Sequence, residues 1–126
     1  MTKSYLKEYV LNRDEILTDI AITFDCTTYH AKQLILCIMM GGNIKTWVKR
    51  YLGKIRYNVK TANAFTHREM RIIIESYLKY LYYSTEPAVV KTRQWINNFK
   101  IEISFIIARI MHRFPGVTKE AEAFHS

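Results

Sequence analysis

The chain has few of the residues that interrupt helices. Its 126 residues include only 4 Gly and 2 Pro, too few for the many turns of a β-sandwich and compatible with long helices. It also lacks any run of about 18 uncharged apolar residues, so the sequence predicts no transmembrane helix. Residues 1–8 lack the apolar core of a signal peptide, and we therefore expect an intracellular protein that is not secreted.

Residues typical of metal or nucleophile chemistry are scarce as well. Cys26 and Cys37 are the only cysteines, and without an export signal we expect two reduced, partly buried thiols. No zinc-finger spacing, Walker loop or nucleophile elbow occurs. Asp14, Glu15 and Asp19 could together hold magnesium, but a solvated helix start is the favoured interpretation. We therefore predict no metal site, no cofactor and no catalytic residue.

Carboxylates are missing from one long stretch. None occurs between Asp25 and Glu69, although the whole chain has 11 Asp and Glu against 19 Lys and Arg. The eight cations in this gap account for the entire net charge of +8, because 19 minus eight equals 11. Charge concentrated in this way is typical of a surface that meets phosphate. The eight cations are Lys32, Lys45, Lys49, Arg50, Lys54, Arg56, Lys60 and Arg68.

Apolar residues recur at helical spacing in the first third of the chain. Residues 4–24 follow intervals of three, four and seven, which predicts either one bent helix or two helices with Asn12 as the second cap. Thr27 or Thr28 is expected to cap the next helix, which should end at Gly41-Gly42 because glycine readily adopts the left-handed conformation of a helix end.

The remaining helices are predicted from caps and breaks. Asn43 should cap a helix through about Leu52, and residues 53–65 look irregular. Residues 66–69 form a capping box that starts a helix to about Tyr83. After the break at residues 84–87, a last helix should run from about Ala88 to Arg113 and stop at Pro115-Gly116.

Together these elements predict an all-α fold, a compact orthogonal bundle of about five helices. Hydrophobic residues make up 49% of the chain, enough for the core of a single domain over residues 1–126. The helix over residues 27–40 and the last helix should lie at the centre. Residues 117–126 are expected to fray.

Cations alternate with aromatic residues in the segment over residues 43–57 (NIKTWVKRYLGKIRY). On an ideal helix Lys45 and Lys49 share one face, while Trp47, Arg50 and Tyr51 lie on an adjoining face. The cations would neutralise phosphates. A tyrosine at 51 or 57 could stack on a base, whereas the core is the favoured place for the tryptophan. The candidate nucleic-acid-binding residues, in contact or in support, are Lys32, Lys45, Trp47, Lys49, Arg50, Tyr51, Lys54, Arg56 and Lys60.

Three short motifs, in this order, resemble a segment of replication proteins from large DNA viruses and related mobile elements. They are residues 5–17 (YLKEYVLNRDEIL), residues 31–34 (AKQL) leading into residues 40–42 (MGG), and residues 99–103 (FKIEI). That group is distantly similar to the palm and fingers of family A DNA polymerases. The resemblance implies a role in DNA replication in the cytoplasm or nucleus of a host cell.

The middle motif can be compared with the fingers helix of family A polymerases, which shows Arg-x3-Lys-x3-Phe-x3-Tyr-Gly. Lys32 and Gly41 match its lysine and glycine, and the resemblance implies a triphosphate contact for the lysine. Thr28, Leu36 and Met40 depart from its arginine, phenylalanine and tyrosine, which weakens that implication and excludes nucleotide selection by an aromatic residue at position 40. The carboxylate motifs that hold metal in such polymerases are absent, so the chain alone is not expected to polymerise nucleotides.

The sequence therefore predicts a nucleic-acid-binding helical protein, a non-catalytic relative or fragment of a viral replication protein. Its expected partners are the phosphate backbone of DNA or RNA and other replication proteins, with no membrane. The alternative is a helical protein–protein interaction module, a viral adaptor or decoy, whose basic face meets an acidic partner. The residues do not distinguish DNA from RNA, and they leave the oligomeric state open.

Overall fold

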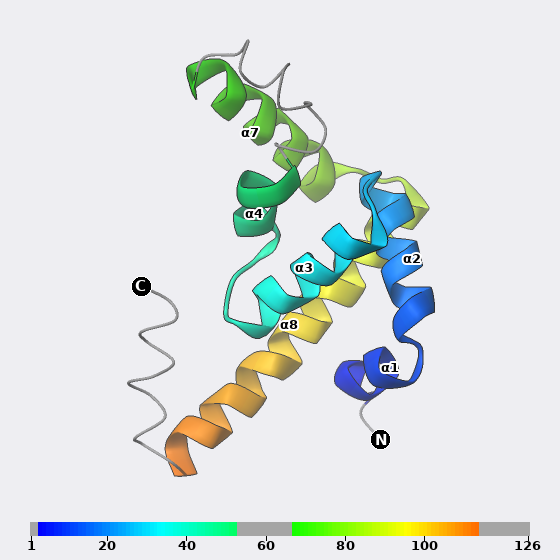
Figure 1. Cartoon of the computed structure of the whole chain (residues 1–126), viewed down its shortest axis with the longest axis vertical. Coiled ribbons are helices and arrows are strands. Elements are labelled where there is room, and N and C mark those ends of the chain that lie inside the picture. The colour runs from blue at the N-terminus through cyan, green and yellow to red at the C-terminus, as the bar shows by residue number, and fades with distance from the viewer. Residues whose placement is uncertain (1–2, 53–66, 114–126) are drawn as a thin grey trace.

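The computed structural model describes residues 3–52 and 67–113, and every regular element in these residues is helical, which confirms the all-α class. None of the helices in this part of the chain is both long and apolar enough to cross a membrane. The predictions for residues 53–66 and 114–126 lie outside the described residues. The elements (Figure 1) are α1 (Tyr5–Leu11), α2 (Arg13–Phe24), α3 (Thr28–Met39), α4 (Ile44–Trp47), the π-helix η1 (Val48–Leu52), α7 (His67–Tyr83) and α8 (Pro87–Arg113).

The first predicted helix is two helices that meet at Asn12. The backbone of Asn12 leaves the helical region at φ −125° and ψ 36°, and its side chain makes no capping hydrogen bond. The predicted cap of the following helix is confirmed, because the Thr27 hydroxyl accepts a hydrogen bond from the His30 N–H at 3.2 Å. Asp25 closes α2 in the left-handed conformation, with φ 54°. Together, Asp25 and Thr27 form the tight connection that reverses the chain between α2 and α3.

Two glycines and a cap form the connection from α3 to α4. Gly41 has φ 89°, as expected for a glycine beyond a helix end. Gly42 lies so close to α3 that an added Cβ would be 2.5 Å from the Sγ of Cys37. Asn43 Oδ1 then accepts a hydrogen bond from the Thr46 N–H at 2.9 Å, which confirms Asn43 as a helix cap.

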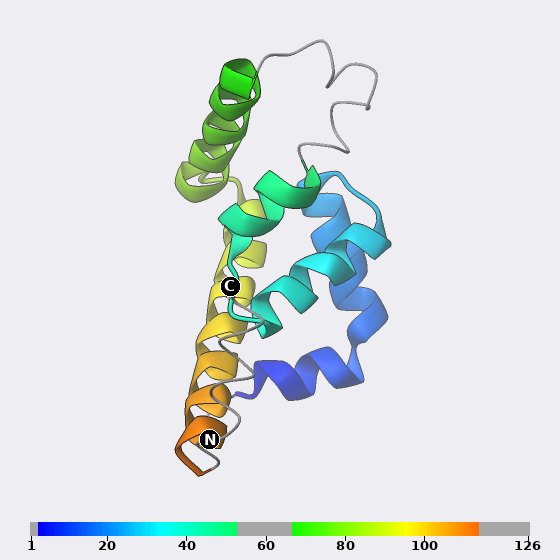
Figure 2. The same ribbon diagram turned by 60° about the vertical axis from the view of Figure 1, so that its left-hand side comes forward.

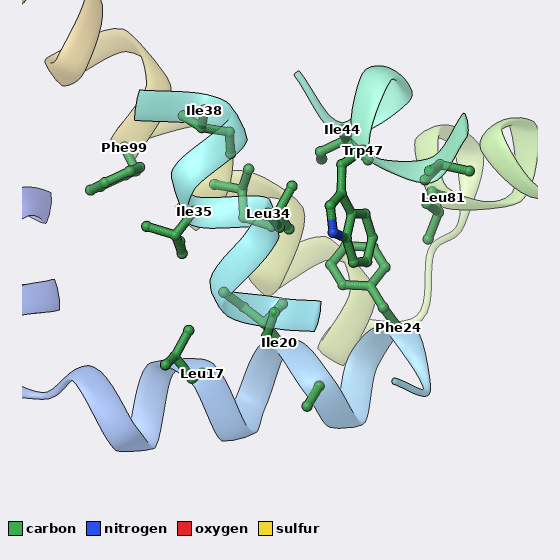
Figure 3. Close-up of a cluster of buried hydrophobic side chains, with 14 of the residues drawn as sticks. Leu17, Ile20, Phe24, Leu34, Ile35, Ile38, Ile44, Trp47, Leu81 and Phe99 are labelled. Atoms are coloured by element: carbon green, nitrogen blue, oxygen red, sulfur yellow. The ribbon is translucent and has the colours of Figure 1, made fainter. Parts of the chain in front are cut away.

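The core forms where α3 packs against α2 on one side and α8 on the other (Figures 1 and 2). The predicted central position of these two helices is therefore confirmed. Large apolar side chains from α2, α3, α4, α7 and α8 meet there, and each contributes about 1.5–3 kcal/mol when fully buried. Figure 3 shows ten of them: Leu17, Ile20, Phe24, Leu34, Ile35, Ile38, Ile44, Trp47, Leu81 and Phe99.

The corner between α7 and α8 is held by polar contacts from α8 and from the linker. One guanidinium nitrogen of Arg93 donates to the carbonyl oxygens of Leu81 at 2.6 Å and Tyr82 at 2.8 Å. These carbonyls belong to the last turn of α7, where no helical N–H is left to bind them. The Tyr80 hydroxyl also donates to the carboxylate of Glu86 at 2.7 Å. α8 starts with Pro87, a residue well suited to a first helical turn.

Candidate nucleic-acid interface

The basic segment is attached to the core through Trp47. Its side chain is fully buried, and its ring meets that of Phe24 edge-on at 5.3 Å between centroids (Figure 3). Its indole N–H donates to the carbonyl oxygen of His30 at 3.0 Å. The favoured core position of Trp47 is therefore confirmed, and the alternative of a direct contact with nucleic acid is wrong because no face of the ring is open. Trp47 fixes α4 against α2 and α3.

A π-helical turn changes which cations share a face. In an α-helix, residues 45 and 50 would point about 140° apart. The wider turn of η1, whose hydrogen bonds join residues five apart, narrows that angle. As a result Lys45, Lys49 and Arg50 line one open concavity of about 520 Å³ together with Asn43 and Thr46. The sequence placed Arg50 on a face adjoining that of the two lysines, and the structure brings all three to the lining of one concavity.

No acidic group among the described residues neutralises the cations of this concavity. The side chains of Lys45, Lys49 and Arg50 are all exposed. The lining includes no carboxylate, and none of the three forms an ion pair with an acidic group in residues 3–52 or 67–113. Burying or pairing these charges would have cancelled most of their effect on a ligand. Here they act together on whatever occupies the concavity.

α8 adds a fourth cation near the same place. Burial raises the pKa of the Cys37 thiol above its ordinary value, while the positive charges of Arg50 and Lys100 act in the opposite direction. Both cations must therefore lie near this half-buried sulfur. Asn43 also lines the adjoining concavity to which Lys100 contributes. We call the combined set the basic surface: Asn43, Lys45, Thr46, Lys49, Arg50 and Lys100.

Sequence reasoning missed Lys100 because it lies far along the chain, in a helix with no other sign of nucleic-acid binding. It also grouped Lys32 with the other candidates. In the structure Lys32 is exposed on α3 but lines a different concavity, shared with Arg13 and the carboxylate of Asp14. The structure does not bring Lys32 into the basic surface. Tyr51 lies in η1, but its side chain and the predicted residues Lys54, Arg56 and Lys60 are outside the described residues.

The acidic residues of the first helices lie elsewhere. Glu8, Glu15 and Asp19 line a groove of about 370 Å³ between α2 and α8, beside Trp95. Within the described part of the chain, no group of three or more His, Cys, Asp or Glu side chains is arranged to hold a metal ion. The acidic groove and the basic surface are lined by different residues.

No protein-family model, curated protein or solved structure matches this chain. The basic surface is therefore the observation from which a function can be inferred.

Proposed function

We propose that this protein binds nucleic acid through its phosphate backbone, and that the basic surface makes the contact. The observation that carries the proposal is the grouping of Lys45, Lys49 and Arg50 in one concavity, with no carboxylate among the described residues that line it. Phosphates that enter this concavity meet three cations that form no ion pair within the described part of the chain. Each contact releases condensed counterions from the nucleic acid, which is the main source of such affinity.

The chemistry of the lining residues favours binding without base recognition. Lysine ammonium groups act as point charges on flexible stems, whereas base reading depends on paired donors in fixed geometry. Only Arg50 among the exposed cations of the concavity carries such a fork of donors. Asn43 Oδ1 and the Thr46 hydroxyl are already hydrogen-bonded to each other at 3.0 Å. We therefore expect affinity that depends strongly on salt and weakly on nucleotide sequence.

We also propose, from the resemblance of its motifs, that the chain is a non-catalytic relative or fragment of a viral replication protein. The middle motif lies on α3 and at its end, with Lys32 exposed and Gly41 closing the helix at φ 89°. This part of the proposal predicts that neighbouring reading frames encode the acidic, metal-binding motifs of such proteins. Sequencing the genomic region tests it, and flanking genes without those motifs would contradict it.

Binding is tested by fluorescence anisotropy with labelled single-stranded DNA, double-stranded DNA and single-stranded RNA across a salt series. With four cations each meeting one phosphate, log Kd should change with log salt by a slope of about 3 to 4 units. The double variant Lys49→Glu with Arg50→Glu should weaken binding by about tenfold or more and reduce the slope by roughly 2. DNA and RNA are compared directly because the phosphate contact is common to both.

The matched control keeps the net charge of the test variant but alters a different surface. Lys7→Glu with Lys91→Glu changes two exposed lysines of α1 and α8 that are not part of the basic surface. Its affinity should stay within about threefold of the parent chain, because distant charges are screened beyond roughly 8–10 Å. Equal losses in both variants would mean that only net charge matters and would contradict the proposed site.

The same titration distinguishes nucleic-acid binding from the competing function, an interaction module for an acidic protein. Absence of oligonucleotide binding at low salt would overturn the nucleic-acid proposal and favour that module. The concavity would then accept carboxylates in place of phosphates, with the same dependence on Lys49 and Arg50.

A further inference from the structure

One face of α8 changes character along its length. Residues three or four positions apart share a helix face, and one exposed face begins with polar residues at positions 91, 94 and 98. From Ile101 the same face is apolar for two turns, with Phe105 and Ala108 following at helical spacing, before the exposed His112. Ile101 is 48% exposed and Phe105 is 66% exposed. A solvated face would have continued with polar side chains.

The apolar part of α8 lies beyond the packed centre of the described chain. Ile103 is the last residue of α8 that is buried, and Ile110 is 44% exposed on the far side of the helix. α1 covers one flank, where the Leu6 N–H donates to Glu102 Oε2 at 2.6 Å. The rest of this half-helix projects away from α2 and α3 (Figures 1 and 2). A helix that is apolar on most sides is normally covered by a partner.

We propose that a second copy of this chain covers the face formed by Ile101, Phe105 and Ala108, with the two α8 helices antiparallel. Two charged residues on the edge of the face favour a second copy of the chain as the partner. Glu102 and Arg109 lie seven residues apart and therefore on the same edge of the helix. A two-fold axis between residues 105 and 106 sets Glu102 of each copy opposite Arg109 of the other.

The symmetry makes this contact self-complementary. Both charge pairs form at once, and Phe105 of one copy packs beside Phe105 of the second copy, as in an isologous interface. A parallel two-fold pair would instead place the two copies of this edge on opposite sides of the seam, so neither Glu102–Arg109 pair would form. The hydrogen bond from Leu6 uses only one oxygen of the Glu102 carboxylate. The other oxygen is left to accept from Arg109.

The face is short, so the dimer should be weak. Its apolar residues span about two turns of helix, less than the contact of a standard stable interface. We expect association in the micromolar range. The inference does not depend on nucleic-acid binding, because the dimer face and the basic surface have no residue in common.

Sedimentation equilibrium of the full chain over micromolar concentrations tests the proposal. The parent chain should pass from monomer to dimer. Phe105→Ser should remain monomeric with unchanged helical circular dichroism, since Phe105 is mostly exposed and contributes little to the fold. Asn98→Ser, on the polar part of the same face, is the matched control and should dimerise like the parent. A parent chain that stays monomeric throughout would overturn the proposal.

Charge reversal tests the two Glu102–Arg109 pairs between the copies. Arg109→Glu sets like charges opposite each other at two places and should weaken dimerisation by about three- to tenfold. Glu102→Gln keeps an oxygen for the Leu6 amide but loses the charge, and should weaken it less. An Arg109→Glu variant that dimerises as well as the parent would contradict the antiparallel pairing.

Cross-linking establishes the orientation of the two helices. In a background with Cys26 and Cys37 replaced by serine, Phe105→Cys should form a disulfide-linked dimer because the two copies of residue 105 meet near the axis. Asn98→Cys should not, since its two copies would be about 22 Å apart along the helices. Cross-linking of both variants indicates a parallel pair and overturns the proposal. If that background does not fold, the comparison is made in the parent chain, whose own cross-linking is the baseline.

Discussion

The indole N–H of Trp47 and the carbonyl oxygen of His30 are joined by a 3.0 Å hydrogen bond that ties the basic segment to α3. Trp47 thus links two parts of the chain that are 17 residues apart. The same side chain fills the space between α2 and α4. The position of the basic surface therefore depends on a residue that takes no part in it directly.

Replacing Trp47 should damage the fold before it affects binding. Trp47→Ala removes a fully buried ring and should lower the free energy of unfolding by about 3–5 kcal/mol. Trp47→Phe keeps most of the apolar contact but leaves the His30 carbonyl without the indole donor, so the loss should be smaller. Urea denaturation followed by circular dichroism measures both. If the alanine variant were as stable as the parent, the packing role of Trp47 would be refuted.

Gly42 should be intolerant of any side chain because of its position above Cys37. A Cβ at position 42 would lie 2.5 Å from the Cys37 Sγ and 3.0 Å from the Cys37 carbonyl oxygen. Gly42→Ala should therefore lower stability by about 1–3 kcal/mol through overpacking. Adding Cys37→Ala should recover part of this loss, since it removes the sulfur but not the carbonyl. A double-mutant cycle measures the coupling, and strictly additive effects would contradict the close contact.

Local signals in the sequence predicted the helix positions well. Thr27 and Asn43 cap the helices that they were predicted to cap, and Gly41 marks the end of α3. These signals act within a few residues, so they can be read without the fold. The break at Asn12 was left undecided because the apolar spacing continues across it and its side chain forms no capping bond.

The composition of the basic surface depended on features that have no local signature. The π-helical turn that carries Lys49 and Arg50 was not predicted, because residue spacing was converted with 3.6 residues per turn and nothing in VKRYL indicates a π-helix. Lys100 joins the surface only because α8 packs against α3. Lys32 was grouped with the others by sequence proximity, yet its helix directs it to another concavity.

Ionisation of Cys37 should lower stability at alkaline pH. Burial raises the pKa of this thiol in the folded chain above its value in the unfolded chain. The thiol of the unfolded chain therefore loses its proton at a lower pH than the thiol of the folded chain. As pH rises above about 8.5, this ionisation favours the unfolded state, and the free energy of unfolding falls. Relative to Cys37→Ala, the parent chain should become progressively less stable between pH 8 and the higher folded-state pKa. Urea titrations across this range measure the difference, and a constant difference would contradict the shift.

The Cys37 thiol should also report on occupancy of the basic surface. It is half-buried and lies near Arg50 and Lys100, so phosphates bound by these cations would restrict access to the sulfur. They would also weaken the positive field that favours the reactive thiolate. Both effects predict slower alkylation of Cys37 by a neutral reagent when oligonucleotide is present. Half-buried Cys26, outside the basic surface, serves as the internal reference in the same sample.

Mass spectrometry of digested protein gives the rate at each cysteine separately. At saturating oligonucleotide and low salt, we expect alkylation of Cys37 to slow several-fold while that of Cys26 stays the same. Raising the salt concentration should abolish the protection, since it restores the counterions that binding displaced. The Lys49→Glu, Arg50→Glu double variant should show no protection at the same oligonucleotide concentration. Protection of both cysteines to the same degree would instead indicate a general tightening of the fold and would argue against phosphate contact at Arg50 and Lys100.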